Sequence, residues 1–480
     1  MEFLSESTGI LLACCFGFAC FGYDGGLFSG ILTNKLFLET FDYPNDTMQG
    51  QITGLYDLGC FFGAIFTFIV GDRFGRKTII TSGSFIHVVG GAIQAASYSV
   101  PQIIVGRIVA GFGNGFMTVA IPVWLSETVP AHKRGKMLTL LSALNVSGIV
   151  FVTFLNFGMR YIKSHFSWRF PVAFQCALAG GTMVLTPFFP ESPRWLIYRG
   201  YNDRAKRSLG RLFGADPDSP EVESMFSEVF VHVEEEKKIA SERSTKDLFG
   251  KDRLHNLRRI LLGAGTQFIQ QFSGVNVALY YLPVLFQNSL GLSETLSLIL
   301  AACNSVNLLI CLVIACLFLI ENVGRRKLMI WGVIGQGTCY LLVAMGLVAG
   351  NQAGSIVSVA FLFGFYTCFG LTWDAIPWLY PPEINSQEYR NIGASVSTAT
   401  NWICNYVVVV ITPIGVANIQ WRFYLIFAIL NYSFIPLLYF FYEETRGLSL
   451  EEIDQIFLRK NPDNELPVFE DKKAEVEHIE

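Results

Sequence analysis

The sequence predicts an all-α membrane protein in which twelve transmembrane helices form two six-helix halves, with short cytoplasmic helices between them. The 480 residues are 52% hydrophobic and only 15% charged, which does not fit a soluble protein of this length. Apolar stretches of about twenty residues, long enough to cross a hydrocarbon core of about 30 Å, recur along the chain. The two halves of the sequence also resemble each other.

The apolar stretches define the predicted spans. We place them at residues 9–31, 51–71, 78–98, 102–123, 137–158, 169–189, 259–284, 297–320, 328–348, 354–380, 391–413 and 421–441. Lys and Arg gather in the connections that follow the even-numbered spans, as at Arg73, Lys133 and Arg326, while the other connections are nearly bare. By the positive-inside rule, we expect both termini in the cytoplasm.

The first span and the connection after it carry two further signals. Asp24 lies inside the span, which lacks a basic leader, so we expect a transmembrane helix there and not a cleaved signal peptide. Asn45 begins an Asn-Asp-Thr glycosylation sequon in the first outward connection, where this topology requires it. The eleven cysteines lie mostly in apolar spans and are interpreted as small hydrophobic residues.

An internal repeat indicates a transporter built from two parallel six-helix halves. Residues 71–77 match residues 321–327, and the segment around Glu127 matches the segment around Glu383 at an offset of 256 residues. The predicted units are an N-terminal half at 1–190, a cytoplasmic helical linker at 191–257, a C-terminal half at 258–442, and a largely disordered cytoplasmic tail at 443–480.

Charged side chains recur at the cytoplasmic ends of both halves. We expect them to form an ion-pair network that closes an inner gate and breaks when the gate opens. The alternative is that these charges are solvated and only set the topology. The carboxylates argue against it, since the positive-inside effect does not need Glu. The predicted gate residues are Asp72, Arg73, Arg76, Glu127, Arg134, Glu191, Arg194, Arg325, Glu383, Arg390 and Glu444.

Five motifs, in order across nearly the whole chain, resemble the sugar porter family of the major facilitator superfamily. They are Gly-Asp-Arg-Phe-Gly-Arg-Lys at 71–77, Pro-Glu-Ser-Pro-Arg-Trp-Leu at 190–196, Gln-Gln-Phe-Ser-Gly-Val-Asn at 270–276, Asn-Val-Gly-Arg-Arg-Lys at 322–327, and Pro377-Trp378 with Glu383. Residues 380–384 and 400–405 resemble a fungal group of glycerol/proton symporters and monosaccharide transporters. The resemblance implies the major facilitator fold, alternating-access transport, no cofactor and no enzymatic activity.

Asp24 is the residue we predict to couple transport to protons. A carboxylate inside a membrane span is costly and indicates function by default. Burial disfavours its charged form and a nearby cation favours it, so its proton affinity can respond to a moving partner. The resemblance implies that this partner is Arg107 in the fourth span, because proton symporters of the family pair these positions. The alternative is a static buried ion pair.

The resemblance also implies a substrate site. Gln270, Gln271 and Asn276 match positions that hold sugar hydroxyls, and amides suit that task because they both donate and accept hydrogen bonds. Asn307 and Trp378 match further family positions, and Tyr280 lies in the same span. Asn401 and Asn405 are as well explained as contacts between helices.

Two departures from the family pattern put the substrate in doubt. Ser142 stands where sugar porters carry a Gln that contacts the sugar, and Asp374 stands where they carry a Gly. The first loses a long hydrogen-bonding side chain, and the second adds an intramembrane carboxylate. A polyol such as glycerol, a pentose, or a substrate with an extra polar group would fit both changes.

We therefore expect a proton-coupled symporter of a small neutral sugar or polyol, with the lipid bilayer as its surroundings. The alternatives are a facilitator and a nutrient receptor on the same fold. His87 could relay protons, but without an obvious partner we interpret it as a packed structural residue. No metal motif and no nucleic-acid partner is indicated. The resemblance implies the plasma membrane, and one chain suffices to form the transport path.

Overall fold

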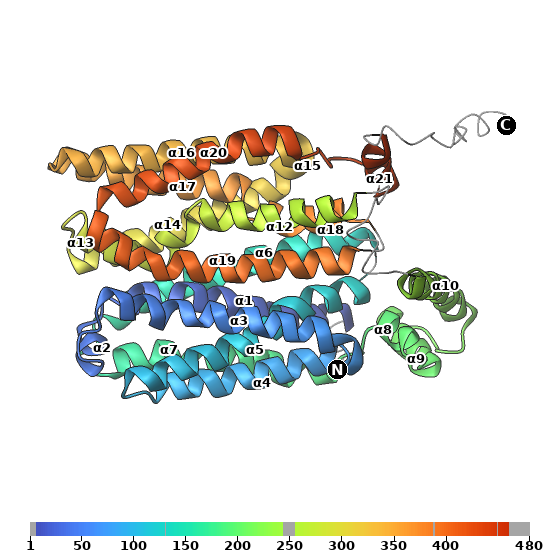
Figure 1. Cartoon of the computed structure of the whole chain (residues 1–480). Helices are drawn as coiled ribbons and strands as arrows, with labels where there is room; N and C mark the ends of the chain where they lie inside the picture. Colours follow the sequence, from blue (N-terminus) through green and yellow to red (C-terminus); the bar gives the residue numbers. More distant parts are fainter. Residues whose placement is uncertain (1–5, 130, 243–254, 387–388, 449, 460–480) are drawn as a thin grey trace.

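The computed structural model describes residues 6–129, 131–242, 255–386, 389–448 and 450–459. Within these ranges the regular structure is helical throughout, which confirms the predicted all-α fold class. Eleven of the helical segments are long and apolar enough to cross a membrane. The twelfth span is the pair α12 and α13, which are individually too short to be counted. The two halves stack as two layers of roughly parallel helices (Figure 1).

The helices of the first half follow the predicted spans within a few residues, with one short addition, α2, in the first connection. They are α1 (Glu6–Ile31), α2 (Lys35–Thr40), α3 (Asp46–Phe74), α4 (Arg76–Ala95), α5 (Val100–Thr128), α6 (Ala131–Met159) and α7 (Phe166–Leu185). The predicted sequon residue Asn45 is the N-cap of α3, where its side-chain oxygen accepts a hydrogen bond from the Met48 backbone at 2.8 Å.

The second half has the same layout with two interrupted spans. Its helices are α12 (Asn256–Phe272), α13 (Val275–Asn288), α14 (Glu294–Ile314), the π-helix η2 (Ala315–Leu319), α15 (Ile320–Val323), α16 (Arg325–Ala349), α17 (Gln352–Thr372), α18 (Ile376–Ile384), α19 (Arg390–Ile419) and α20 (Trp421–Phe441).

The predicted helix 259–284 is broken at Gly274. Gly274 has a φ of 95°, and a Cβ there would lie 2.8 Å from the Tyr340 ring. Carbonyls freed by the break are satisfied from other helices: the Tyr340 hydroxyl donates to the Gly274 carbonyl at 2.6 Å, and the Asn431 amide donates to the Ser273 carbonyl at 3.0 Å. Such satisfaction is what lets a helix break inside a membrane.

The predicted helix 354–380 is also broken, at Trp373, Asp374 and Ala375 between α17 and α18. Backbone carbonyls at this break and in the first turn of α18 accept hydrogen bonds from side chains of α12, since Pro381 has no N–H to donate to the Pro377 carbonyl. The Gln270 amide donates to the Trp373 carbonyl at 2.9 Å, and the Gln267 amide donates to the Pro377 carbonyl at 2.7 Å. The two interrupted spans therefore hold each other together.

Short helices cover one end of the bundle, which we call the linker side (Figure 1). They are α8 (Pro193–Tyr198), α9 (Asn202–Phe213), α10 (Pro220–Glu242) and α21 (Leu450–Arg459). The amphipathic helices expected between the halves are thus present. Helix α21 lies within the tail predicted to be largely disordered; it is ordered because Ile453 and Phe457, four residues apart, are both buried. Residues 460–480 lie outside the described ranges.

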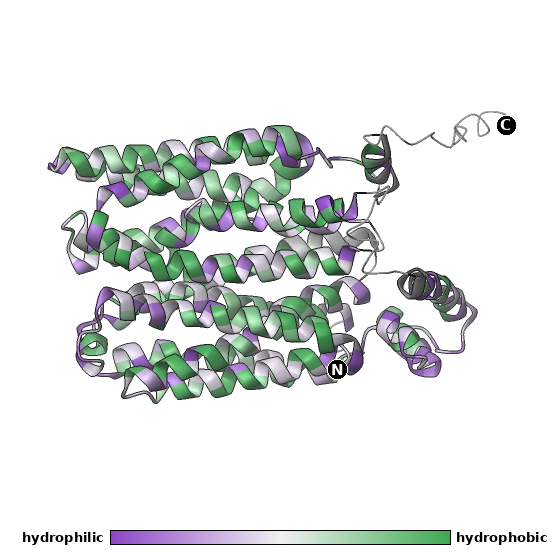
Figure 2. Cartoon of the chain, viewed as in Figure 1, coloured by the Kyte–Doolittle hydropathy of each residue, from purple (hydrophilic) through white to green (hydrophobic). Residues whose placement is uncertain are grey.

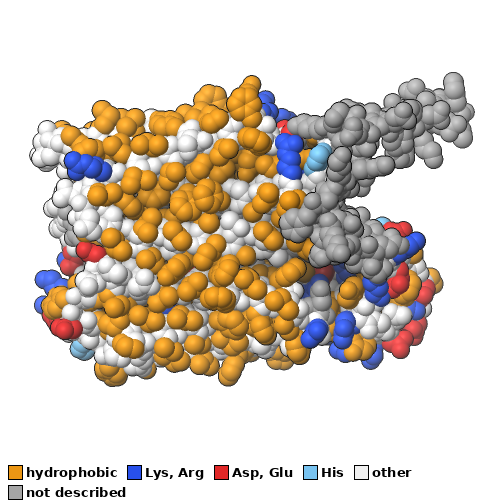
Figure 3. Space-filling view, viewed as in Figure 1, with side chains coloured by type: hydrophobic (Ala, Val, Ile, Leu, Met, Phe, Trp, Pro, Cys, Tyr) orange, Lys and Arg blue, Asp and Glu red, His pale blue; other side chains and the backbone are white. Residues whose placement is uncertain are grey.

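Hydrophobic side chains cover the flank of the bundle. The large exposed ones include Phe62, Ile69, Leu317 and Trp331. Figure 2 shows apolar residues along the whole length of the long helices, and Figure 3 shows charged side chains gathered toward the two ends of the bundle. A surface with this pattern is suited to lipid along its flank and to water at its ends.

Candidate functional site

A cavity of about 1320 Å³ lies between the two halves. Its walls reach the linker side, where Arg76, Glu127, Arg194 and Arg390 line it, so the cavity is open at that end. The polar residues deeper in its wall come from both halves. They are Ser142, Asn145, Gln267, Gln270, Gln271, Asn276, Tyr280, Asp374, Asn401 and Asn405.

Contacts between the halves close the opposite end, which we call the far side. Asp57 on α3 accepts hydrogen bonds from Asn405 on α19 at 3.1 Å and from Tyr280 on α13 at 3.4 Å. The hydroxyls of Thr153 on α6 and Ser305 on α14 lie 3.0 Å apart. The structure is therefore that of a carrier open to the linker side.

The predicted amides of the seventh span do line the cavity, but they also bind one another and the backbone. The Asn276 amide donates to the side-chain oxygen of Gln271. The Asn401 amide donates to the side-chain oxygens of Gln267 at 2.7 Å and Gln270 at 3.3 Å. Since each group has remaining hydrogen-bonding capacity, the cluster presents a preorganised polar wall.

The other predicted substrate residues divide into two sets. Ser142, Tyr280, Asp374 and Trp378 line the cavity. Asn307 is not among the lining residues. Its amide donates to the Phe363 carbonyl and to the Thr367 hydroxyl, both at 3.1 Å, so in this structure it joins α14 to α17.

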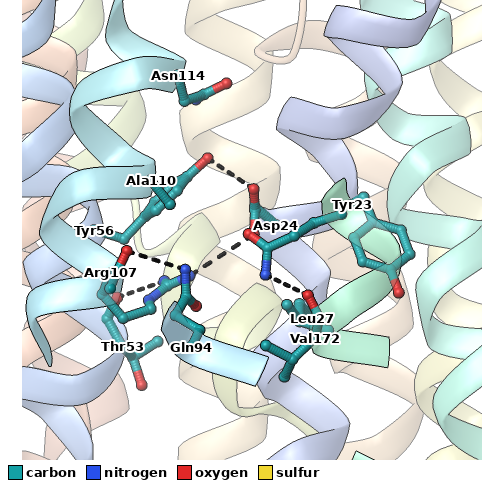
Figure 4. Close-up of polar contacts among 12 residues, drawn as sticks. Tyr23, Asp24, Leu27, Thr53, Tyr56, Gln94, Arg107, Ala110, Asn114 and Val172 are labelled. Atoms are coloured by element: carbon teal, nitrogen blue, oxygen red, sulfur yellow. Dashed lines mark hydrogen bonds and ion pairs between the residues drawn. The ribbon is translucent and has the colours of Figure 1, made fainter. Parts of the chain in front are cut away.

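Asp24 is fully buried on α1, and three side chains converge on its carboxylate. Figure 4 shows two of them, Tyr56 and Arg107. The Tyr56 hydroxyl donates to Oδ2 at 3.1 Å, and His87 Nε2 lies 3.1 Å from the same oxygen. Arg107 is more distant, with Nη1 at 3.8 Å from Oδ1. The structure thus brings the predicted pair together, but it places a histidine closer to the carboxylate than the arginine.

Arg107 is fixed mainly by other groups. Its Nε and Nη2 donate to the carbonyls of Ile52 at 3.1 Å and Thr53 at 2.8 Å. Its guanidinium carbon lies 4.4 Å from the centre of the Phe28 ring and 4.3 Å from that of Tyr56. Cation–π contacts and backbone acceptors together keep this cation buried without a close carboxylate.

The predicted gate residues of the first half form a cluster at the start of α4. Arg76 Nε lies 3.0 Å from Glu127 Oε2, and the Lys77 backbone N–H donates to Glu191 at 3.2 Å. Burial raises the pKa of the Glu191 carboxyl, while backbone N–H groups of Ser192 and Lys77 oppose that rise. Glu191 therefore caps α4 with its carboxylate.

The second half repeats this cluster at the start of α16. Arg325 Nη2 lies 2.9 Å from Glu383 Oε1, and Glu444 accepts from the backbone N–H groups of Arg325 at 2.8 Å and Arg326 at 3.1 Å. Each of these ion pairs joins residues of one half. The described side chains do not include those of Asp72 and Arg134, and Arg73 is exposed.

Several residues of the candidate site belong to none of the quoted motifs. Asp57 is a second intramembrane carboxylate, and the rule that singles out Asp24 would also have found it. Gln267 and Asn145 line the cavity but belong to none of the quoted motifs. The side chains of Tyr56 on α3 and His87 on α4 contact Asp24 on α1, and no local sequence signal reveals these contacts.

Comparison with known proteins decides the family. Residues 10–457 match the family described as "Sugar (and other) transporter". The chain belongs to this family. Its members are transporters and not enzymes. The chain is 42% identical to the "MFS-type transporter oryC" of Aspergillus oryzae, over 94% of this chain and 85% of the relative.

Other relatives of this chain have names that specify what they transport. It is 39% identical to the "Sugar transporter STL1" of Saccharomyces cerevisiae, over 95% of this chain and 82% of that protein. It is 30% identical to "High-affinity glucose transporter 1" of Candida albicans, over 96% and 89%. Its fold matches the proton:xylose symporter XylE with a TM-score of 0.77 at 24% identity, covering 94% of this chain and 99% of that one.

Proposed function

We propose that this protein is a proton-coupled symporter of a small neutral sugar or polyol that works by alternating access. The observation that carries the proposal is the buried Asp24 carboxylate, which meets Tyr56, His87 and Arg107 directly beside the central cavity. Asp24 itself does not line the cavity, but Gly25 next to it does. A carboxylate in this position can exchange a proton without contacting the substrate.

The proposed cycle uses the loose contact between Asp24 and Arg107. When Asp24 is protonated, its attraction to Arg107 weakens, so substrate binds and the carrier changes its open side. When the proton leaves, the carboxylate is drawn toward Arg107 and the carrier resets. The 3.8 Å separation in the linker-side-open structure is compatible with the protonated stage.

The cavity wall supports a polyhydroxylated substrate. Gln270, Gln271 and Asn276 offer both donors and acceptors, and Trp378 offers an aromatic face for a sugar ring. Relatives named for sugar and glucose transport support the same class. Asp374 adds a carboxylate that only accepts when ionised, which favours a substrate with several hydroxyl donors. Asn307 would require a rearrangement to reach the substrate.

We propose that the linker side is cytoplasmic, that the membrane is the plasma membrane, and that one chain is the working unit. The basic residues of the linker side and the sequon at Asn45 on the other side support this orientation. In the proposed inner gate, Arg76–Glu127 and Arg325–Glu383 approach each other when the cavity closes. Asp72 and Arg134 belong to the same proposal from their sequence positions.

The test is uptake of radiolabelled glucose, galactose, xylose, arabinose and glycerol into proteoliposomes, with and without an imposed inward proton gradient. Wild type is compared with Asp24→Asn. We expect gradient-driven accumulation of at least one solute, abolished by the substitution, with counterflow exchange retained because the substrate wall is intact.

Two results would redirect the proposal. Equilibration that ignores both the gradient and Asp24 would make the protein a facilitator with a structural ion pair. If the wild type and the variant both insert correctly and neither takes up any of the solutes, a receptor or a different substrate class would be favoured.

A further inference from the structure

His87 makes contacts that a histidine with a purely structural role would not require. It is fully buried on α4, and its Nδ1 lies 3.0 Å from the Ala110 carbonyl of α5. Its Nε2 faces two groups of α1 at once, Asp24 Oδ2 at 3.1 Å and Cys20 Sγ at 3.3 Å. Histidine, carboxylate and thiol therefore meet at a single nitrogen.

The geometry determines which ring nitrogen carries a fixed proton. A carbonyl oxygen only accepts hydrogen bonds, so Nδ1 must be the donor to Ala110. In neutral His87 the lone pair then lies on Nε2 and points at Asp24. Two lone pairs 3.1 Å apart repel in a buried site, so a proton between Asp24 Oδ2 and His87 Nε2 would stabilise the contact as observed.

We propose that this shared position, and not the Asp24 carboxyl alone, is the binding site of the coupling proton. The inference rests on the proposed proton coupling and names a further residue that performs it. In the loaded state, the proton lies between Oδ2 and Nε2, Tyr56 donates to the same carboxylate, and Arg107 is held at a distance by Ile52 and Thr53.

Cys20 supplies the hydrogen bond that His87 needs in the unloaded state, in which the coupling proton has left. In the loaded state its thiol donates to the Gln175 carbonyl at 3.7 Å. When the proton leaves for the water of the cavity next to Gly25, Asp24 becomes a free carboxylate and moves toward Arg107. The thiol hydrogen then turns to Nε2, which would otherwise be a buried acceptor without a donor. One proton leaves, and no other group changes its protonation.

Other titratable groups face Asp24 and His87 from the neighbouring helices, and their charges affect how tightly the shared proton is bound. They are Cys20 and Tyr23 on α1, Tyr56, Asp57 and Cys60 on α3, Arg107 on α5, and Cys176 on α7. Arg107 is the one cation among them, and it opposes a second positive charge on His87. The shared proton is therefore held by direct hydrogen bonding against that repulsion.

The test compares His87→Gln and Cys20→Ala with Cys14→Ala, a buried thiol of the same helix that does not contact His87. Glutamine retains a hydrogen-bonding group but cannot bind the proton. We expect the pH at half-maximal gradient-driven uptake to move about one unit toward acid in His87→Gln, which is a tenfold loss of proton affinity. Cys20→Ala destabilises the unloaded state, so its midpoint moves toward alkaline pH. Cys14→Ala matches wild type.

A second measurement does not depend on transport. Infrared difference titration of the purified full-length protein follows the band that Asp24→Asn removes, and its midpoint should show the same two opposite shifts. Midpoints in His87→Gln and Cys20→Ala equal to wild type would show that His87 is structural and overturn the inference, with proton coupling by Asp24 intact. Loss of gradient-driven uptake in wild type would instead remove the proposed function on which the inference rests.

Discussion

Asp57 shows how a single buried side chain can join the two halves. Its carboxylate lies on α3 of the first half, yet both of its hydrogen-bond donors, Tyr280 and Asn405, belong to the second half. The same two donors line the cavity. Opening the far side must break these contacts, so Asp57 links the closure of that side to groups that a bound substrate would touch.

We predict that Asp57→Ala shifts the carrier away from the linker-side-open state. Loss of the acceptor leaves two buried donors unpaired, at a cost of about 1–3 kcal/mol each. Hydrogen–deuterium exchange at the far-side ends of α3 and α19 should therefore rise. Thr67→Ala, a buried polar change on the same helix, should leave those peptides unchanged. Equal exchange in both variants would contradict a closing role for Asp57.

At the scale of elements, the two halves use the same device where α4 and α16 begin. Gly75 and Gly324 have φ values of 85° and 98°, which favour glycine. Each bends the chain so that a distant glutamate, Glu191 or Glu444, accepts from the first N–H groups of the helix. A carboxylate at this position stabilises the helix through its dipole.

We predict that Gly75→Ala and Gly324→Ala each lower the midpoint of thermal unfolding in detergent. An added Cβ would lie 2.7 Å from Glu191 or 2.6 Å from Glu444. The backbone at both positions, with positive φ and ψ of 161° or 155°, is essentially restricted to glycine and adds roughly 1–3 kcal/mol of strain to another residue. The control is Gly180→Ala in α7, where no atom lies within 4 Å of the new Cβ. A loss in Gly180→Ala as large as in the other two would contradict the explanation.

At the scale of the whole molecule, the structure predicts how the carrier can be locked. Thr153 and Ser305 meet across the far side with hydroxyls 3.0 Å apart, so cysteines at these positions would bring two sulfur atoms together between the halves. Oxidised Thr153→Cys/Ser305→Cys should stop uptake and keep the linker side open, and reductant should restore it. Each single variant under the same oxidant is the control. Uptake that survives complete cross-linking would mean that the halves do not separate there.

The sequence predicted the spans and the linker helices, because hydropathy and charge patterns are local properties, and the resemblance to the sugar porter family implied the amides that line the cavity. The breaks at Gly274 and Asp374 could not be predicted in the same way. Each break depends on donors from other helices, such as Tyr340 and Gln270, and the sequence around the break does not show these donors. The partner of His87 was likewise hidden, since only the folded structure brings this side chain of α4 to Asp24 on α1.

The interrupted seventh span has a consequence for biosynthesis. Helix α12 has only 17 residues and carries Arg258, Arg259, Gln267, Gln270 and Gln271. A segment this polar would not partition from the translocon into lipid by itself. Its glutamines find partners on α18 and α19, which are synthesised about a hundred residues later. Helix α12 must therefore remain at the translocon, or against the completed first half, until α18 and α19 have been synthesised.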